Sequence, residues 1–285
     1  MSEVGVLASP LVDAATLAGE LAGARPPVVL DVRYVALTGP DLAAYRAAHI
    51  PGAVFVDLDR ELAGVVGPGT GRHPLPDVAV LQAFARSWGM CDDSSVVVYD
   101  DGPAMAASRA WWLLRWAGHD DVRVLDGGLA AWVAAGGRTS TEAPEPDYGD
   151  VTLRADQMPV VDVADVPAAV RDGVLFDVRA GERYRGETEP IDPVAGHVPG
   201  AVNAPAPGNI GADGRFLAPD VLRERFAGLG WRDGAPVTAM CGSGVVAAQT
   251  VLALATAGIP ARLFVGSWSQ WVSDPDRPVA TGATP

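Results

Sequence analysis

The sequence is short of cysteine, of basic residues and of long hydrophobic runs, and each shortage excludes a class of protein. Cysteine occurs only twice in 285 residues, as Cys91 and Cys241, which is too few for a disulfide framework or a cysteine-rich metal site. A reduced, intracellular protein is a simpler interpretation than one disulfide between them. Basic residues number 21 against 35 acidic ones, which gives a formal net charge of −14. Neither nucleic acid nor an anionic membrane is expected as a partner, because both bind basic patches.

No stretch of the sequence is suited to targeting or to crossing a membrane. The longest mainly apolar run, residues 245–259, is too short to span a bilayer, and residues 1–5 lack the basic and apolar regions of a signal peptide. We therefore expect a cytoplasmic protein. We expect no metal and no other cofactor, because the four histidines are scattered and His49 and His197 occupy equivalent places in an internal repeat.

The two halves of the sequence repeat each other. Four segments of the first half return in the same order in the second half, offset by about 140 to 148 positions: VVLDVR (28–33) as VLFDVR (174–179), AHIPGAV (48–54) as GHVPGAV (196–202), VVVYD (96–100) as VTAMC (237–241), and LDGGLAAW (125–132) as FVGSWSQW (264–271). A period of this length is that of a whole domain, so the pattern indicates a duplication and not a solenoid.

Each half alternates short β-branched runs with alanine-rich, helix-compatible stretches. In the first half the runs are 28–32, 54–57, 96–99 and 122–125, and the helical stretches are 41–48, 78–88 and 105–117. This alternation predicts an α/β fold in which each domain has a mainly parallel central sheet flanked by helices. A segment rich in proline and acidic residues separates the halves. We predict a first domain over 1–140, a linker over 141–159 and a second domain over 160–285.

Cys241 is the strongest candidate for a reactive group. It ends a strand-like run, 237–240, and a glycine-rich turn leads directly into a predicted helix over 245–257. Backbone N–H groups of the turn and the positive end of the helix dipole both favour a thiolate. The alternative is a small buried core cysteine. The counterpart of Cys241 in the first half is Asp100 or Asp101, with no thiol nearby, so only the second domain carries a thiol at this loop.

Taken in order, these motifs resemble the tandem-domain rhodanese family, the thiosulfate and 3-mercaptopyruvate sulfurtransferases. The resemblance implies two rhodanese domains, of which the first is inactive. It also implies that the Cys241 thiolate takes a sulfane sulfur from a small donor as a persulfide and passes it to a thiol, cyanide or thioredoxin. The backbone N–H groups of the loop would bind the donor sulfur and stabilise the thiolate and the persulfide anion; the loop residues concerned are Gly242, Gly244, Val245, Val246 and Ala247. An alternative is a sulfur carrier that serves a protein partner and turns over small donors poorly.

The residues after Cys241 bear on the donor. Thiosulfate-preferring relatives of the animal enzyme carry Arg-Lys there, whereas this chain has Gly242-Ser243, which is similar to the loop of mercaptopyruvate enzymes. In that group a serine, a histidine and an acidic residue form a proposed proton relay, and the matching positions are Ser243, His73 and Asp59. The alternative for His73 is a histidine on a solvent-facing loop.

A donor carboxylate needs a cation, and arginine binds a carboxylate with two hydrogen bonds. By resemblance Arg183 is the substrate-binding arginine, and Arg185 is a second candidate; the alternative is a surface turn paired with local acids. The chain departs from the mercaptopyruvate pattern in two places. EPIDP (189–193) stands where those enzymes place a second arginine, and Val246 replaces a common threonine. The sequence therefore leaves 3-mercaptopyruvate and thiosulfate both open as donors.

Overall fold

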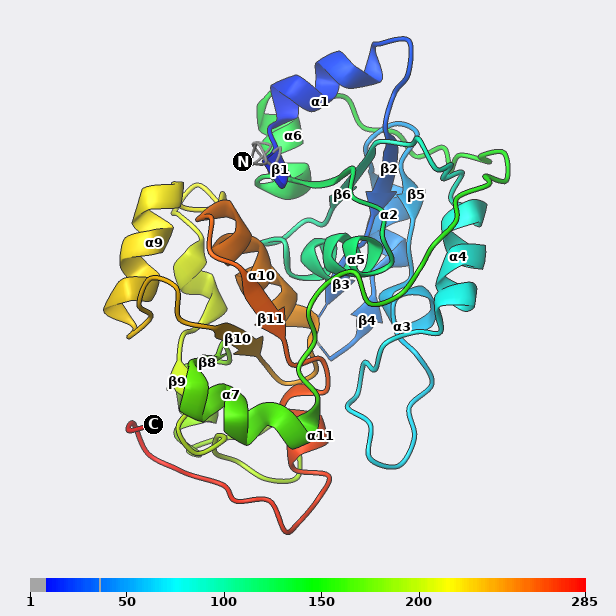
Figure 1. The fold of residues 1–285 in the computed structure, drawn as a ribbon. Helices are drawn as coiled ribbons and strands as arrows, with labels where there is room; N and C mark the ends of the chain where they lie inside the picture. The colour runs from blue at the N-terminus through cyan, green and yellow to red at the C-terminus, as the bar shows by residue number, and fades with distance from the viewer. Residues whose placement is uncertain (1–8, 36) are drawn as a thin grey trace, which may run out of the picture.

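The computed structural model describes residues 9–35 and 37–285, whose two halves form two domains side by side (Figure 1). In the described residues the first domain has a parallel sheet in the order β1–β7–β6–β2–β5, with the bounds β1 Leu11–Val12, β2 Val28–Asp31, β5 Val54–Phe55, β6 Val96–Tyr99 and β7 Val122–Leu125. A separate antiparallel pair joins β3 Tyr34–Val35 to β4 Gly39–Pro40.

Helices cover both faces of this sheet, because its central strands carry apolar side chains on both faces. Alternate strand residues face opposite sides. Val29 and Val97 pack with α1 and α6, whereas Leu30 and Val98 pack with α4 and α5. The helices of the first domain are α1 Ala14–Leu21, α2 Leu42–Ala47, α3 Leu58–Glu61, α4 Val78–Ser87, α5 Met105–Trp116 and α6 Gly128–Ala134.

Aspartate side chains fix where four of these helices begin. Asp13, Asp41, Asp57 and Asp77 each accept a hydrogen bond from a backbone N–H in the first turn of α1, α2, α3 and α4. Aspartate is a strong N-cap because it pairs an otherwise unbonded N–H and complements the positive end of the helix dipole. Part of the acidic excess of the sequence therefore has a structural use.

The second domain repeats the first. Its parallel sheet has the order β11–β10–β8–β9, with the bounds β8 Val174–Asp177, β9 Val202–Asn203, β10 Val237–Met240 and β11 Ala261–Leu263. Val160 forms an isolated parallel bridge with Leu263, at the edge that β1 occupies in the first domain. The helices are α7 Val166–Asp172, α8 Gly181–Tyr184, α9 Pro219–Gly228, α10 Val245–Thr256 and α11 Ser267–Trp271, with short 3-10 turns at Val163–Asp165 and Ala206–Asn209. The predicted fold class is confirmed.

The two domains share one hydrophobic core. Helices α5 and α10 pack against each other at the centre of the molecule (Figure 1), and one cluster of buried residues runs from the first sheet through both helices to the second sheet. Trp111, Trp112 and Trp116 of α5 belong to this cluster, as their helical spacing beside leucines suggests. The close packing of α5 on α10 brings the carboxyl ends of both sheets to a common region.

The segment 141–159 forms neither helix nor strand, but it is bonded to the first domain. Val151 and Leu153 are buried, and their backbone N–H groups donate to the Met90 carbonyl and the Gln82 side chain. The predicted linker is therefore fixed along the surface of the first domain. None of the helices in the described ranges has the length and apolar composition needed to cross a membrane.

Candidate active site

Cys241 lies where β10 ends and α10 is about to begin, and only 2% of it is exposed. The N–H of Gly244 donates to its Sγ at 3.1 Å, and the hydroxyl of Ser267 lies 4.0 Å from the same sulfur. The Cys241 N–H donates to Ser267 Oγ at 3.0 Å, which fixes the backbone at this point. The Gly244 N–H thus points its positive end at the sulfur, whereas the Ser267 hydroxyl donates to the Phe264 carbonyl at 2.9 Å.

Gly244 is required for this geometry. Its φ is +82°, in the left-handed region that glycine adopts without strain. A Cβ at this position would lie 2.2 Å from the Val265 carbonyl oxygen. Both features hold the turn tight enough for the N–H to reach the sulfur.

The first domain contains the same turn built around an anion. Asp100 follows β6 as Cys241 follows β10, and its carboxylate accepts hydrogen bonds from four backbone N–H groups, those of Gly102, Ala104, Ala106 and Ala107. Burial raises the pKa of Asp100 to about 6. The duplicated loop is thus a cradle of backbone amides, which directs four N–H groups to the Asp100 carboxylate and one, that of Gly244, to the sulfur of Cys241.

A cavity of about 850 Å³ opens above Cys241. Its walls come from both domains: Asp59, His73 and Asp100 on one side, and Arg183, Cys241 and Ser243 on the other. Among the loop residues expected to bind substrate, Gly242, Val245 and Val246 line this cavity, whereas Gly244 and Ala247 do not. Gly244 contacts the sulfur from below, and Ala247 is fully buried in the core.

Ser243, His73 and Asp59 form a continuous chain of hydrogen bonds. His73 Nδ1 lies 2.8 Å from Ser243 Oγ, and His73 Nε2 lies 3.1 Å from Asp59 Oδ1. Because an ionised carboxylate only accepts, Nε2 carries the proton and Nδ1 accepts from the Ser243 hydroxyl. Burial lowers the pKa of His73, and the nearby Arg109 guanidinium lowers it further, while Asp59 raises it. Because its pKa is lowered overall, the His73 imidazole is neutral and can accept a proton from Ser243.

Arg109 supports the histidine from within the core. It lies on α5 and is fully buried, and burial lowers its pKa to about 10. Its Nη2 donates to the carbonyls of Leu62, His73 and Pro74, at 3.1 to 3.3 Å. The loop that carries His73 is therefore fixed by a buried cation. No motif of the sequence indicated this residue.

Two arginines lie over the cysteine loop. Arg183 donates to Glu189 at 2.5 and 3.1 Å and to Asp192 at 3.3 Å, and Arg72 of the first domain is hydrogen-bonded to Asp192. A Cβ on Gly242 would lie 2.8 Å from a nitrogen of Arg72 and 3.6 Å from one of Arg183, so both guanidinium groups converge on one point. No sequence motif indicated a role for Arg72, although it directly precedes His73.

Arg185 does not take part. Its side chain pairs with Glu187 at 2.7 Å, is 38% exposed and does not line the cavity. The structure therefore brings Arg183, but not Arg185, to the cysteine loop.

The protein-family comparison identifies both domains. The family model described as "Rhodanese-like domain" matches residues 13–135 and 162–274. The chain belongs to the rhodanese family. It is 51% identical to "Probable 3-mercaptopyruvate sulfurtransferase" of Pseudomonas aeruginosa, over 90% of this chain and 92% of that protein. It is 47% identical to "Putative thiosulfate sulfurtransferase SseB" of Mycobacterium tuberculosis, over 95% and 97% of the two chains.

A solved structure supports the same assignment. The crystal structure of SseA from Escherichia coli, described as a 3-mercaptopyruvate sulfotransferase with the rhodanese fold, superposes with a TM-score of 0.80 at 33% identity, covering 92% of this chain and 99% of that one. This rhodanese is a sulfurtransferase of the 3-mercaptopyruvate or thiosulfate type.

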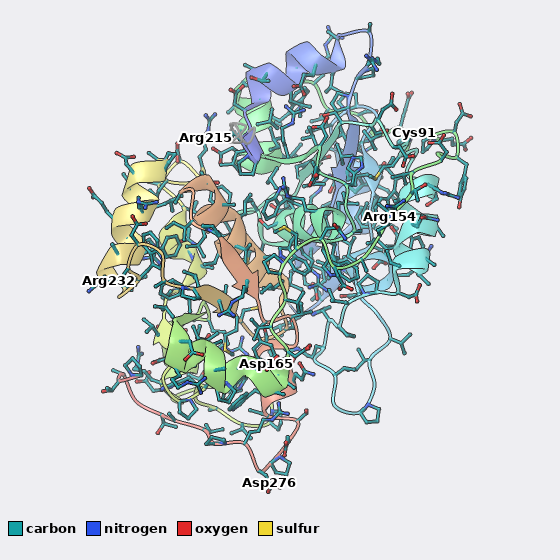
Figure 2. All side chains as sticks on the ribbon, viewed as in Figure 1. Cys91, Arg154, Asp165, Arg215, Arg232 and Asp276 are labelled. Atoms are coloured by element: carbon teal, nitrogen blue, oxygen red, sulfur yellow. The ribbon has the colours of Figure 1, made fainter. Side chains whose placement is uncertain are left out.

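A second cysteine and a metal site are the two other kinds of reactive site that this sequence could offer. Cys91 is a free, half-buried cysteine that Figure 2 places in the first domain near α4, and Cys241 is also free. Across residues 9–35 and 37–285, no cluster of three or more histidine, cysteine, aspartate or glutamate side chains could hold a metal ion.

Proposed function

We propose that this rhodanese transfers sulfur from 3-mercaptopyruvate to an acceptor thiol, or to cyanide, through a persulfide on Cys241. The observation that carries the proposal is the unbroken chain from Ser243 through His73 to Asp59, which ends in the same cavity as the buried sulfur. Thiosulfate needs no proton transfer at carbon, so a relay at this place favours a carbon-bound donor.

The proposed first half-reaction balances without any other reactant. The Cys241 thiolate attacks the sulfur of the donor, forming an S–S bond and breaking the carbon–sulfur bond. The electron pair of that bond becomes an enolate, which takes up the proton of the donor thiol and leaves as pyruvate. Ser243 follows Cys241 by two positions, and its hydroxyl is hydrogen-bonded to a neutral His73. The Ser243 hydroxyl can therefore move this proton from the donor sulfur to the enolate. The persulfide anion remains in the amide cradle.

The second half-reaction returns the cysteine to its starting state. An acceptor thiolate attacks the outer sulfur of the persulfide, the S–S bond breaks, and Cys241 leaves as a thiolate. The cavity of about 850 Å³ is far larger than a small donor needs, so it leaves room for an acceptor. Thioredoxin stays among the proposed acceptors, beside small thiols and cyanide.

Arg72 and Arg183 are the proposed binding groups for the donor carboxylate. Both guanidinium groups face the loop directly over Gly242, next to the sulfur. A carboxylate bound between them would place the mercapto sulfur of a three-carbon donor near Cys241, because an arginine pair fixes both the position and the plane of a carboxylate.

Mass spectrometry of the protein treated with 3-mercaptopyruvate tests the persulfide. One added sulfur, about 32 Da, is expected on Cys241 in the wild type and in Cys91→Ser, and not in Cys241→Ser. Retention of the adduct in Cys241→Ser, or no adduct with 3-mercaptopyruvate in the wild type, would contradict the proposal.

The relay is tested by comparing donors in Ser243→Ala. We expect kcat/KM for 3-mercaptopyruvate to fall about 100-fold, because general acid–base catalysis contributes about that much, while thiosulfate loses far less. Equal losses with the two donors would show that Ser243 shapes the loop and moves no proton.

A further inference from the structure

Six ionised side chains form one alternating chain from the second sheet to the first domain. In order they are Asp177, Arg179, Glu189, Arg183, Asp192 and Arg72, and each is bonded to the next. Three carboxylates thus balance three arginines. The chain ends at Arg72, beside the cysteine loop.

The internal repeat shows which of these six charged side chains belong to the fold and which serve the site. Asp177 and Arg179 have counterparts in Asp31 and Arg33 of the first domain, with the same two-pronged pairing. In both domains the arginine also donates to a backbone carbonyl of the turn that precedes the next strand. This pair therefore belongs to the domain architecture. Of the other four side chains, Arg72 and Arg183 line the cavity, and Glu189 and Asp192 are bonded to these two arginines.

Asp192 contacts both cations that face Cys241. One of its oxygens is hydrogen-bonded to Arg72, and the other lies 3.3 Å from Nη2 of Arg183. Its side chain is only 4% exposed, so solvent screens its charge little. The pKa of Asp192 is raised above its ordinary value by burial and by the neighbouring Glu189, although Arg72 and Arg183 offset part of this shift. Asp59, Asp100 and Asp101 are the acids that line the cavity, and Glu189 is bonded to Arg183, but none of these four is hydrogen-bonded to both Arg72 and Arg183.

We propose that Asp192 determines the charge of the sulfur donor, because its carboxylate disfavours a dianion over a monoanion between Arg72 and Arg183. The Coulomb energy of two charges is proportional to their product. Asp192 therefore opposes thiosulfate, with two negative charges, about twice as strongly as 3-mercaptopyruvate, with one. Asp192 thus selects the donor by its charge, and this inference rests on the proposed function.

The substitution Asp192→Asn tests this role, because it keeps the size of the side chain and removes its charge. We expect the ratio of kcat/KM for thiosulfate to kcat/KM for 3-mercaptopyruvate to rise about tenfold, as a repulsion between partly screened charges a few ångströms apart predicts. Persulfide formation on Cys241 in a single turnover reports this step alone. Asp192→Glu should keep the wild-type ratio.

Glu187→Gln is the matched control. Glu187 stands five positions earlier on the same segment, pairs with Arg185 outside the cavity and is 54% exposed. The same loss of one charge there should leave the donor ratio unchanged. A second measurement needs no variant: in the wild type, pyruvate should inhibit more strongly than sulfate, because the site disfavours the dianion.

The outcomes separate this inference from the proposed function. If neither donor forms a persulfide in the wild type, the proposed function fails. If the wild type reacts but Asp192→Asn lowers kcat/KM equally for both donors, Asp192 only positions the arginines, and the inference is overturned. An unchanged ratio, or stronger inhibition of the wild type by sulfate than by pyruvate, overturns it as well.

Discussion

Gly244→Ala tests whether the tight turn below Cys241 holds the sulfur in its reactive setting. An alanine would have to adopt φ near +82°, which costs about 1–2 kcal/mol. Its Cβ would also lie 2.2 Å from the Val265 carbonyl oxygen, and relieving such a clash costs about 1–3 kcal/mol more. We therefore expect the free energy of unfolding to fall by about 2–5 kcal/mol in total.

The same variant should lose activity beyond its loss of stability. Relief of the clash moves the N–H of Gly244 away from Sγ, where it now donates at 3.1 Å. Removal of one such donor from an anion site costs about 100-fold in rate in other enzymes, and we expect a loss of that order in persulfide formation. Denaturant unfolding measures the stability, and single-turnover persulfide formation measures the rate.

Gly258→Ala is the control at the other end of the same helix. Gly258 has φ +70°, but a Cβ there would meet nothing within 4 Å. Gly258→Ala should lower the free energy of unfolding only by the backbone strain, about 1–2 kcal/mol, and should keep the wild-type rate of persulfide formation. If Gly244→Ala forms persulfide within about threefold of Gly258→Ala, the amide of Gly244 does not support the sulfur, and the reasoning is refuted.

Three further predictions concern the relay, the arginines and the core. Burial lowers the pKa of His73 below its ordinary value of 6.5. We therefore expect kcat/KM for 3-mercaptopyruvate to stay constant above pH 6.5 and to decline at lower pH, where the imidazole takes up a proton. The pH profile for thiosulfate should lack this decline. Arg183→Gln should lower kcat/KM at least about tenfold, whereas Arg185→Gln, outside the cavity, should leave it within about twofold; equal effects in steady-state assays would contradict the assignment. Leu254→Ala in α10 should lower the free energy of unfolding by about 2–5 kcal/mol in a denaturant titration, because the side chain is fully buried; a change below about 1 kcal/mol would mean that the shared core is plastic there.

The fold was predictable because its determinants are local. β-branched runs such as 96–99 form strands, and alanine-rich stretches such as 105–117 form helices within one residue of the expected bounds. The position of Cys241 followed from the same logic, since a strand, a glycine turn and a helix in succession place the turn at the carboxyl edge of the sheet. The association of Ser243 with His73 came from resemblance, because 170 positions separate the two residues.

The parts of the site that escaped prediction depend on contacts between distant segments. Arg109 looks like a polar position of an ordinary helix, and only the packing of α5 on α10 makes it a buried cation beneath the His73 loop. Arg72 acquires its place by crossing from the first domain to Asp192 in the second. Resemblance favoured Arg183 over Arg185, and in the structure Arg183, in α8, lines the cavity, whereas Arg185, which caps the end of α8, does not.

The duplication serves as an internal control for assigning roles. His49 and His197 both hydrogen-bond a tyrosine carbonyl four or thirteen residues earlier, at 2.8 Å, and both stack on that tyrosine ring. A contact kept in both halves belongs to the fold, because Cys241 has no counterpart thiol at the equivalent loop of the first half. By the same test, a residue of the cavity with no equivalent contact in the other half belongs to the chemistry. Ser243 and Cys241 meet that criterion, and we therefore expect both to act in the reaction. At the equivalent positions, four backbone N–H groups bind the Asp100 carboxylate in the first domain, and the Gly244 N–H binds the sulfur of Cys241 in the second.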